Sequence, residues 1–157
     1  MKDLTIILDN HKLNIRAAAV IIHDNKILTH KNINEDFYGL VGGRVQIGES
    51  SDITIKREIF EEMGKEIEIK EFLTTIENFF PGDGTKYHEI MFVYRAEFVD
   101  EEDKKITETI HNIEGEDELR YEWIDIDKLD EIPLKPKIIK NMIKENKFIN
   151  HTINNDF

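Results

Sequence analysis

The chain has 157 residues, of which 39% are hydrophobic and 34% are charged. This length suits one domain with a sizeable core, and the composition is too apolar for a disordered chain. No run of residues approaches the roughly 20 apolar positions that a membrane span requires. We therefore expect a single soluble α+β domain over residues 1–157, with residues 150–157 forming a frayed tail.

Charge and cysteine content narrow the classes of function. The 33 acidic residues against 21 basic ones give a formal net charge of −12, which opposes binding in a DNA groove or to an anionic membrane surface. The chain has no cysteine, which excludes a disulfide scaffold, a thiol nucleophile and a cysteine zinc site. Its first residues are too acidic for a signal peptide. We expect a cytoplasmic protein.

The hydrophobic pattern predicts a sheet with few helices. Asp24 and Asn25 separate two apolar runs, which favours a hairpin turn, and residues 81–84 contain the proline and glycines of a second connection between long strands. Strands are predicted at residues 16–22, 26–29, 37–41, 66–80, 87–99 and 119–126. The strongly polar stretch 100–117 is predicted to be a loop.

Two helices are predicted from apolar residues at helical spacing. The first covers residues 52–63, because Ser51 is a candidate N-cap, Ile55 and Ile59 share one face, and Gly64 suits the residue after a helix end. The second covers residues 133–148. A mixed or antiparallel sheet with few helices is typical of an α+β layered fold.

Three carboxylates gather on the first helix. Glu58, Glu61 and Glu62 lie at positions i, i+3 and i+4, which places them on one helix face. Two unit charges about 6 Å apart repel by ~3 kcal/mol at an effective dielectric of about 20, so a partly buried cluster needs a compensating cation. Oxygen ligands of this kind suit Mg²⁺ or Mn²⁺. The alternative is an exposed acidic helix face, which is common.

The residues around these glutamates carry a family signature. After Gly43, five residues lead to Glu49, and seven more lead to the run Arg-Glu-Ile-Phe-Glu-Glu-Met-Gly at residues 57–64. This spacing resembles the Nudix box, so the chain is identified as a member of the Nudix hydrolases. The resemblance is tight from Gly43 to Gly64 and looser along most of the chain. Lys65 and Val41 depart from the usual residues, which affects local packing rather than a chemical group.

The resemblance implies an α/β/α sandwich with a mixed β-sheet, in which the box forms a loop-helix-loop unit. It implies metal ligation by Glu58, Glu61 and Glu62, with the carbonyl of Gly42 as an additional ligand. Mg²⁺ is the implied cation, and Mn²⁺ is a substitute. Arg57 and Glu49 would orient the ligating carboxylates.

The general base and the phosphate contacts are less closely defined. The base is either Glu58 or a glutamate from a later loop, and Glu118 ranks ahead of Glu114 and Glu116 because its spacing to the next aromatic residue resembles the family. Arg44, immediately after the glycine pair, is the candidate for binding a substrate phosphate.

The implied reaction is metal-dependent hydrolysis of a nucleoside diphosphate linked to another moiety. The alternative is a catalytically silent Nudix module that only binds a nucleotide, although every charged position of the box is present. The expected partner is a small nucleotide. Family members often pair as dimers, so a homodimer is the assembly that the resemblance allows.

Overall fold

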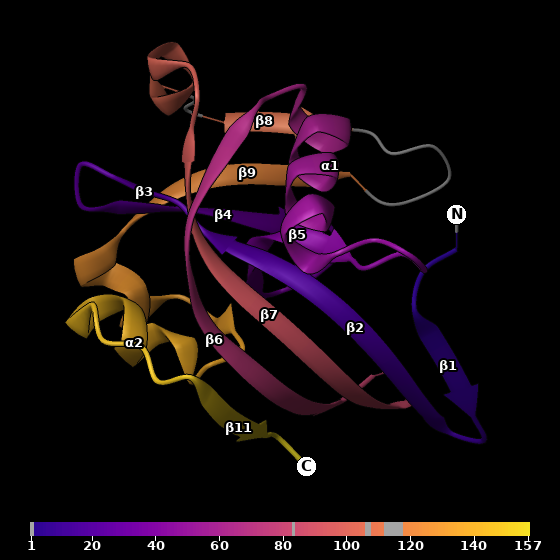
Figure 1. Ribbon diagram of the computed structural model, residues 1–157. Coiled ribbons are helices and arrows are strands. Elements are labelled where there is room, and N and C mark those ends of the chain that lie inside the picture. The colour runs from indigo at the N-terminus through magenta and orange to yellow at the C-terminus, as the bar shows by residue number, and fades with distance from the viewer. Residues whose placement is uncertain (1, 83, 106–107, 112–117) are drawn as a thin grey trace.

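The computed structural model describes residues 2–82, 84–105, 108–111 and 118–157 (Figure 1). Its strands are β1 (Thr5–Leu8), β2 (His11–Val20), β3 (Ile22–His23), β4 (Lys26–Asn32), β5 (Tyr38–Arg44), β6 (Ile67–Pro81), β7 (Lys86–Phe98), β8 (Glu108–His111), β9 (Leu119–Asp125), β10 (Leu134–Lys135) and β11 (His151–Asn155). The helices are α1 (Ser51–Met63), α2 (Ile139–Glu145) and the 3-10 helices η1 (Glu101–Lys105) and η2 (Ile126–Glu131).

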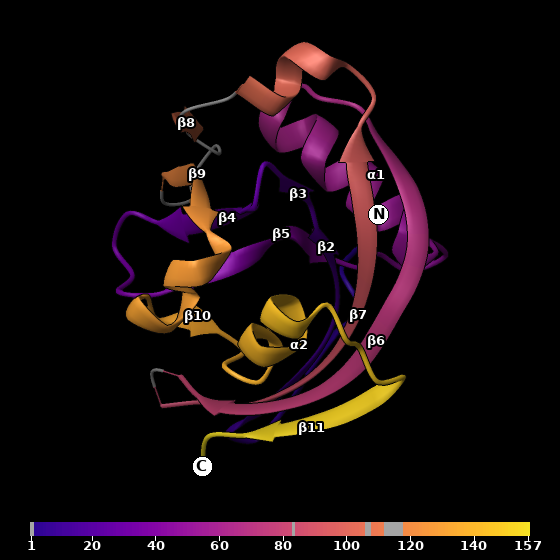
Figure 2. The same ribbon diagram turned by 90° about the vertical axis from the view of Figure 1, so that its left-hand side faces the viewer.

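The strands of the described residues form one mixed sheet in the order β11-β6-β7-β2-β5-β4-β9-β8. β2 lies at its centre, parallel to β7 and antiparallel to β5. β6 and β7 form the predicted long antiparallel hairpin, and both strands curve around α2 (Figure 2). No helix among the described residues has the length and apolarity needed to span a membrane.

Both faces of the central strand are buried, which defines the layers. Ala17 and Ala19 of β2 pack in the cluster that contains Ile55 and Ile59 of α1. Their neighbour Ala18 packs in the other cluster, with residues of α2. Alternate side chains of a strand point to opposite faces, so α1 and α2 cover opposite sides of the sheet (Figures 1 and 2). This is the α/β/α sandwich that was predicted.

The first helix forms for local reasons. Thr54, Ile55, Ile59 and Met63 are its buried residues, one stripe along the axis. Gly64 ends the helix in the left-handed conformation, with φ of 66°, and its N–H donates to the carbonyl of Phe60 at 2.9 Å. The N-cap is Ser50, one residue before the predicted Ser51.

Two assignments differ from the prediction because they depend on distant partners. The run 16–22 does not pair as a whole with 26–29: only Ile22 and His23 pair with β4, across a turn in which Asp24 and Asn25 have positive φ. The stretch 100–117, predicted to be a loop, contains η1 and the strand β8, which pairs with β9.

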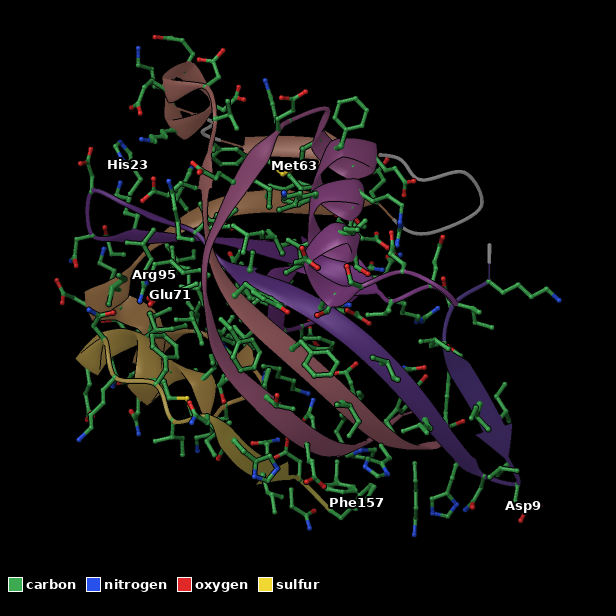
Figure 3. All side chains as sticks on the ribbon, in the orientation of Figure 1. Asp9, His23, Met63, Glu71, Arg95 and Phe157 are labelled. Atoms are coloured by element: carbon green, nitrogen blue, oxygen red, sulfur yellow. The ribbon has the colours of Figure 1, made fainter. Side chains whose placement is uncertain are left out.

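The C-terminal segment contains two further corrections. The helix predicted over 133–148 is confined to α2, because Pro136 disfavours helix at the residue before it, and Leu134–Lys135 instead pair with β5. The tail is not frayed: His151–Asn155 add β11 to the sheet edge, parallel to β6. Arg95 of β7 lies beside Glu71 (Figure 3) and binds its carboxylate at 2.9 Å. It also binds Asn146, the residue that caps α2, at 2.8 Å.

Candidate active site

A cavity of about 430 Å³ lies where α1 faces the strands β2, β4 and β5. Glu58, Glu61 and Glu62 of α1 and the pair Gly42-Gly43 of β5 are on its wall. The other lining residues are Asp3, Arg16, His30, Asn32, Glu35, Phe37, Gly39, Arg44, Gln46, Arg57 and Leu119. The fold therefore brings the three glutamates and Gly43 of the sequence signature, together with the preceding Gly42, to one cavity.

Two of the three carboxylates are electrostatically unfavourable in the metal-free protein. Burial raises the pKa of Glu58 above its ordinary value against the opposing effect of Arg57. Burial also raises the pKa of Glu62 to about 7, although the hydrogen bond from Tyr121 opposes the shift. Loss of hydration disfavours the charged form of a carboxyl group, so these side chains carry a cost that a bound cation would relieve.

Arg57 is the hydrogen-bonding centre of the cluster. Its Nε and Nη2 donate to the two carboxylate oxygens of Glu49 at 2.8 and 3.0 Å, and its Nη1 donates to Glu58 at 2.9 Å and to Glu61 at 3.0 Å. Thr54 also donates to Glu49, at 2.8 Å. The hydrogen bond from Arg57 holds the pKa of Glu49 below its ordinary value, and the same bond raises the pKa of Arg57. Glu49 and Arg57 therefore form an ionised pair at neutral pH.

Gly42 and Gly43 must be glycine because neighbouring atoms lie too close for a Cβ at either position. Gly42 has a φ of 142°, and a Cβ on it would lie 2.1 Å from the carbonyl oxygen of Ala17 on the paired strand β2. A Cβ on Gly43 would lie 2.1 Å from the carboxyl carbon of Glu58. Only glycine at position 43 lets the Glu58 side chain lie against the strand.

Two arginines line the cavity besides Arg57. Arg16 of β2 donates to the carbonyl of Gly42 at 3.1 Å, a contact that leaves the second lone pair of that oxygen for another partner. Arg44 has a half-exposed side chain 3.4 Å from Asp3, and its carbonyl accepts a hydrogen bond from Arg57 at 3.2 Å. Arg44 is therefore placed where a ligand in the cavity can meet its guanidinium group.

Of the three loop glutamates, the structure describes Glu118, which is not among the residues that line the cavity. Glu118 precedes β9, and its backbone carbonyl accepts the N–H of Ile33 at 3.0 Å, whereas the next residue, Leu119, lines the cavity. Glu114 and Glu116 lie outside the described residues.

Sequence reasoning missed two residues beside the glutamates, the buried Tyr121 and the half-buried His30. Tyr121 of β9 donates a hydrogen bond from its hydroxyl to Glu62, and His30 of β4 packs edge-on against the Tyr121 ring at 6.1 Å. Burial, with the nearby Arg16 cation, lowers the pKa of His30 to about 3, so this imidazole is neutral. Neither residue belongs to a local motif. The apolar and polar alternation of their strands was the signal available, and it does not indicate a partner 59 residues away.

The donor chemistry of this wall fits a hard divalent cation. Carboxylate and carbonyl oxygens are the ligands that Mg²⁺ and Mn²⁺ prefer, and the raised pKa values of Glu58 and Glu62 mark negative charge without sufficient compensation. In the described part of the chain, no three acidic or histidine side chains already form a group that could hold a metal ion. Arg57 and Tyr121 hold the carboxylates in this arrangement.

Comparison with known proteins defines the family. The NUDIX domain model matches residues 13–145, which include the whole box and most of the sheet. The chain therefore belongs to the Nudix hydrolase family.

Solved structures share the fold at low sequence identity. A NUDIX hydrolase from Nitrosomonas europaea superposes with a TM-score of 0.64 at 17% identity, over 91% of this chain and 79% of that one. A mutator MutT protein from Bacillus halodurans gives 0.62 at 19% identity, over 91% of both chains. An ADP-ribose pyrophosphatase from Streptococcus suis gives 0.58 at 15% identity, over 88% of this chain and 97% of the other.

Proposed function

We propose that this protein hydrolyses a phosphoric anhydride bond in a nucleoside diphosphate linked to another moiety, with a divalent cation bound at the α1 wall of the cavity. One observation carries the proposal: Glu58, Glu61 and Glu62 line a single cavity beside Gly42 and Gly43. An exposed acidic helix face would instead point all three carboxylates to solvent. Family membership supports the same chemistry.

In this proposal, Glu58, Glu61, Glu62 and the carbonyl of Gly42 hold Mg²⁺, for which Mn²⁺ substitutes. When bound, the cation neutralises phosphate charge, polarises the attacked phosphorus and lowers the pKa of a bound water. The residues supply a rigid wall of oxygen donors at the end of β5 and along one face of α1. Their raised pKa values fit this role, because the cation takes over the compensation that water provides elsewhere.

Arg57 and Glu49 orient this wall rather than react. The guanidinium group grips Glu49 with two hydrogen bonds, and its Nη1 donates to Glu58 and Glu61. A bidentate pair fixes the plane of the guanidinium group, so the direction of the third nitrogen is fixed as well. Glu49 thus acts on the ligating carboxylates through Arg57.

Glu58 is the general base that the geometry favours over Glu118. It lies on the cavity wall with its side chain 17% exposed, whereas Glu118 is not among the lining residues of the described chain. In the reaction, water attacks phosphorus, its proton passes to the base, and the anhydride oxygen leaves with the second product.

The substrate in this proposal is a small nucleotide. Arg44 binds a phosphate at the cavity edge, as a guanidinium group can donate two parallel hydrogen bonds to it. The net charge of −12 opposes nucleic-acid grooves, and the lack of cysteine fits a reducing cytoplasm. Sedimentation or gel filtration of the purified chain tests whether it forms a homodimer.

A substrate panel tests the function. Nucleoside triphosphates, ADP-ribose, nucleotide sugars and dinucleoside polyphosphates are incubated with the protein and Mg²⁺, and released phosphate groups are measured. We expect turnover of at least one class, its loss in EDTA, and its recovery with Mg²⁺ or Mn²⁺. Tight nucleotide binding without turnover of any class would instead identify a silent binding module, and turnover that persists in EDTA would refute metal dependence.

A further inference from the structure

The hydrogen bond between Tyr121 and Glu62 links two elements that are distant in sequence. Tyr121 lies on β9 and is fully buried, with 0% exposure. Its hydroxyl donates to Oε2 of Glu62, the second-last residue of α1. A buried hydroxyl that donates to a carboxylate makes a charge-assisted bond, which restricts the orientation of the carboxylate strongly.

Glu62 needs such a partner more than the other two glutamates. Arg57 pairs with Glu58 at 2.9 Å and with Glu61 at 3.0 Å, while the ion pairs of the described residues include none to Glu62. The like charges of Glu58 and Glu61 repel the Glu62 carboxylate, which favours its movement away from them. The Tyr121 hydroxyl opposes this movement from the interior side of the helix.

The tyrosine is itself contacted by a row of side chains that line the cavity. Its ring meets the His30 ring edge-on at 6.1 Å, and Nε2 of His30 lies 3.4 Å from Nη2 of Arg16. The same Nη2 donates to the carbonyl of Gly42 at 3.1 Å. This row therefore joins the Glu62 carboxylate on α1 to the Gly42 carbonyl on β5, which are two oxygen donors of the proposed site.

We propose that Tyr121 is a positioning residue that sets the Glu62 carboxylate for binding the divalent cation. The inference rests on the proposed metal-dependent function. Tyr121 does not touch the cation or the substrate and acts only through Glu62. Removing its hydroxyl leaves the carboxylate on the cavity wall but free to rotate, so each binding event must order it again.

Direct binding of Mn²⁺ without substrate tests this assignment. Isothermal titration calorimetry is performed on the wild-type chain, Tyr121→Phe, Glu62→Gln and the double variant. Loss of a residue that orients a metal ligand typically weakens metal binding by about 10- to 100-fold, and we expect a loss in this range for Tyr121→Phe. In the Glu62→Gln background, the same change is expected to alter affinity less than about twofold, because the two residues act as one unit.

Tyr94→Phe is the matched control. Tyr94 also hydrogen-bonds α1, at Ser51 with a distance of 2.8 Å, but it contacts the first turn instead of the carboxylates. We expect its Mn²⁺ affinity to equal that of the wild type. Equal losses in Tyr121→Phe and Tyr94→Phe would show a general effect on the helix and overturn the proposal.

The remaining outcomes separate the inference from the function on which it rests. If Glu62→Gln weakens binding and Tyr121→Phe does not, or if their losses simply add, Tyr121 has no positioning role while the metal site stands. If Glu62→Gln binds Mn²⁺ as tightly as the wild type, the metal assignment of Glu62 fails.

A measurement on the wild-type protein covers the case in which Tyr121→Phe does not fold. The buried hydroxyl proton is expected as a slowly exchanging downfield signal in the proton NMR spectrum, and it should persist on addition of diamagnetic Mg²⁺. Its loss on Mg²⁺ binding would show that the cation displaces the tyrosine, which contradicts positioning.

Discussion

The Glu49→Gln substitution probes the ion pair that organises the carboxylate wall. The Glu49 side chain is 5% exposed and that of Arg57 is 19% exposed, so the pair is largely removed from water. Arg57 donates to both carboxylate oxygens, and Thr54 donates to one of them. Whichever way the glutamine amide turns, its NH₂ group must face at least one of these donors.

The cost follows from this geometry. Removal of one partner from a buried ion pair costs about 3–5 kcal/mol, because the other charge is left without compensation. Arg57 keeps Glu58 and Glu61 as partners, so we expect a loss of about 3 kcal/mol, at the low end. With a urea m-value of about 1–3 kcal/mol/M, the unfolding midpoint should fall by about 1–3 M.

The pH dependence of the unfolding free energy checks independently that the Glu49 carboxylate stabilises the folded state. The pKa of Glu49 in the folded state lies below its ordinary value of 4.5, so its contribution is complete above that value and is lost as the pH falls through the lower folded-state pKa. The difference in unfolding free energy between wild type and Glu49→Gln should be full at neutral pH and shrink in acid.

Urea unfolding followed by circular dichroism measures both effects. Glu61→Gln is the control, since Glu61 is 57% exposed and an exposed pair contributes about 1 kcal/mol or less. A Glu49→Gln midpoint equal to that of Glu61→Gln would refute the view that Glu49 anchors Arg57.

Four other substitutions test the site. Glu62→Gln should raise the stability of the metal-free protein above about pH 7 and change it little near pH 4.5, because burial raises the Glu62 pKa from 4.5 to about 7 and ionisation in that interval costs stability; thermal melts in EDTA measure this. Gly43→Ala places a Cβ 2.1 Å from the Glu58 carboxyl carbon, so turnover should fall about 100-fold while the far-ultraviolet circular dichroism spectrum is unchanged. Glu58→Gln should lower kcat by about 100- to 10,000-fold and remove the acidic limb of the pH–rate profile. Glu118→Gln should leave kcat and the acidic limb as in the wild type. The reverse ranking of the two variants would assign the base to Glu118.

The sequence by itself determined the parts of this protein that depend on neighbours along the chain. The spacing from Gly43 to Gly64 identified the family, and the repeat of apolar residues predicted a helix within one residue of α1. The i, i+3, i+4 spacing of the glutamates put their carboxylates on one face for a geometric reason that no tertiary contact changes. The β6 and β7 hairpin was equally readable, because its strands are joined by a short connection.

Only the tertiary structure decided which distant residues meet. Tyr121 reaches Glu62 across 59 positions because it packs in the same core cluster as the buried face of α1, and Arg16 reaches the Gly42 carbonyl because β2 pairs with β5. The tail predicted to fray forms β11 because it pairs with the edge strand β6. The composition of the tail alone does not indicate this partner. Local periodicity predicts the type of an element and its buried face. The partners of that element depend on the packing of the whole chain.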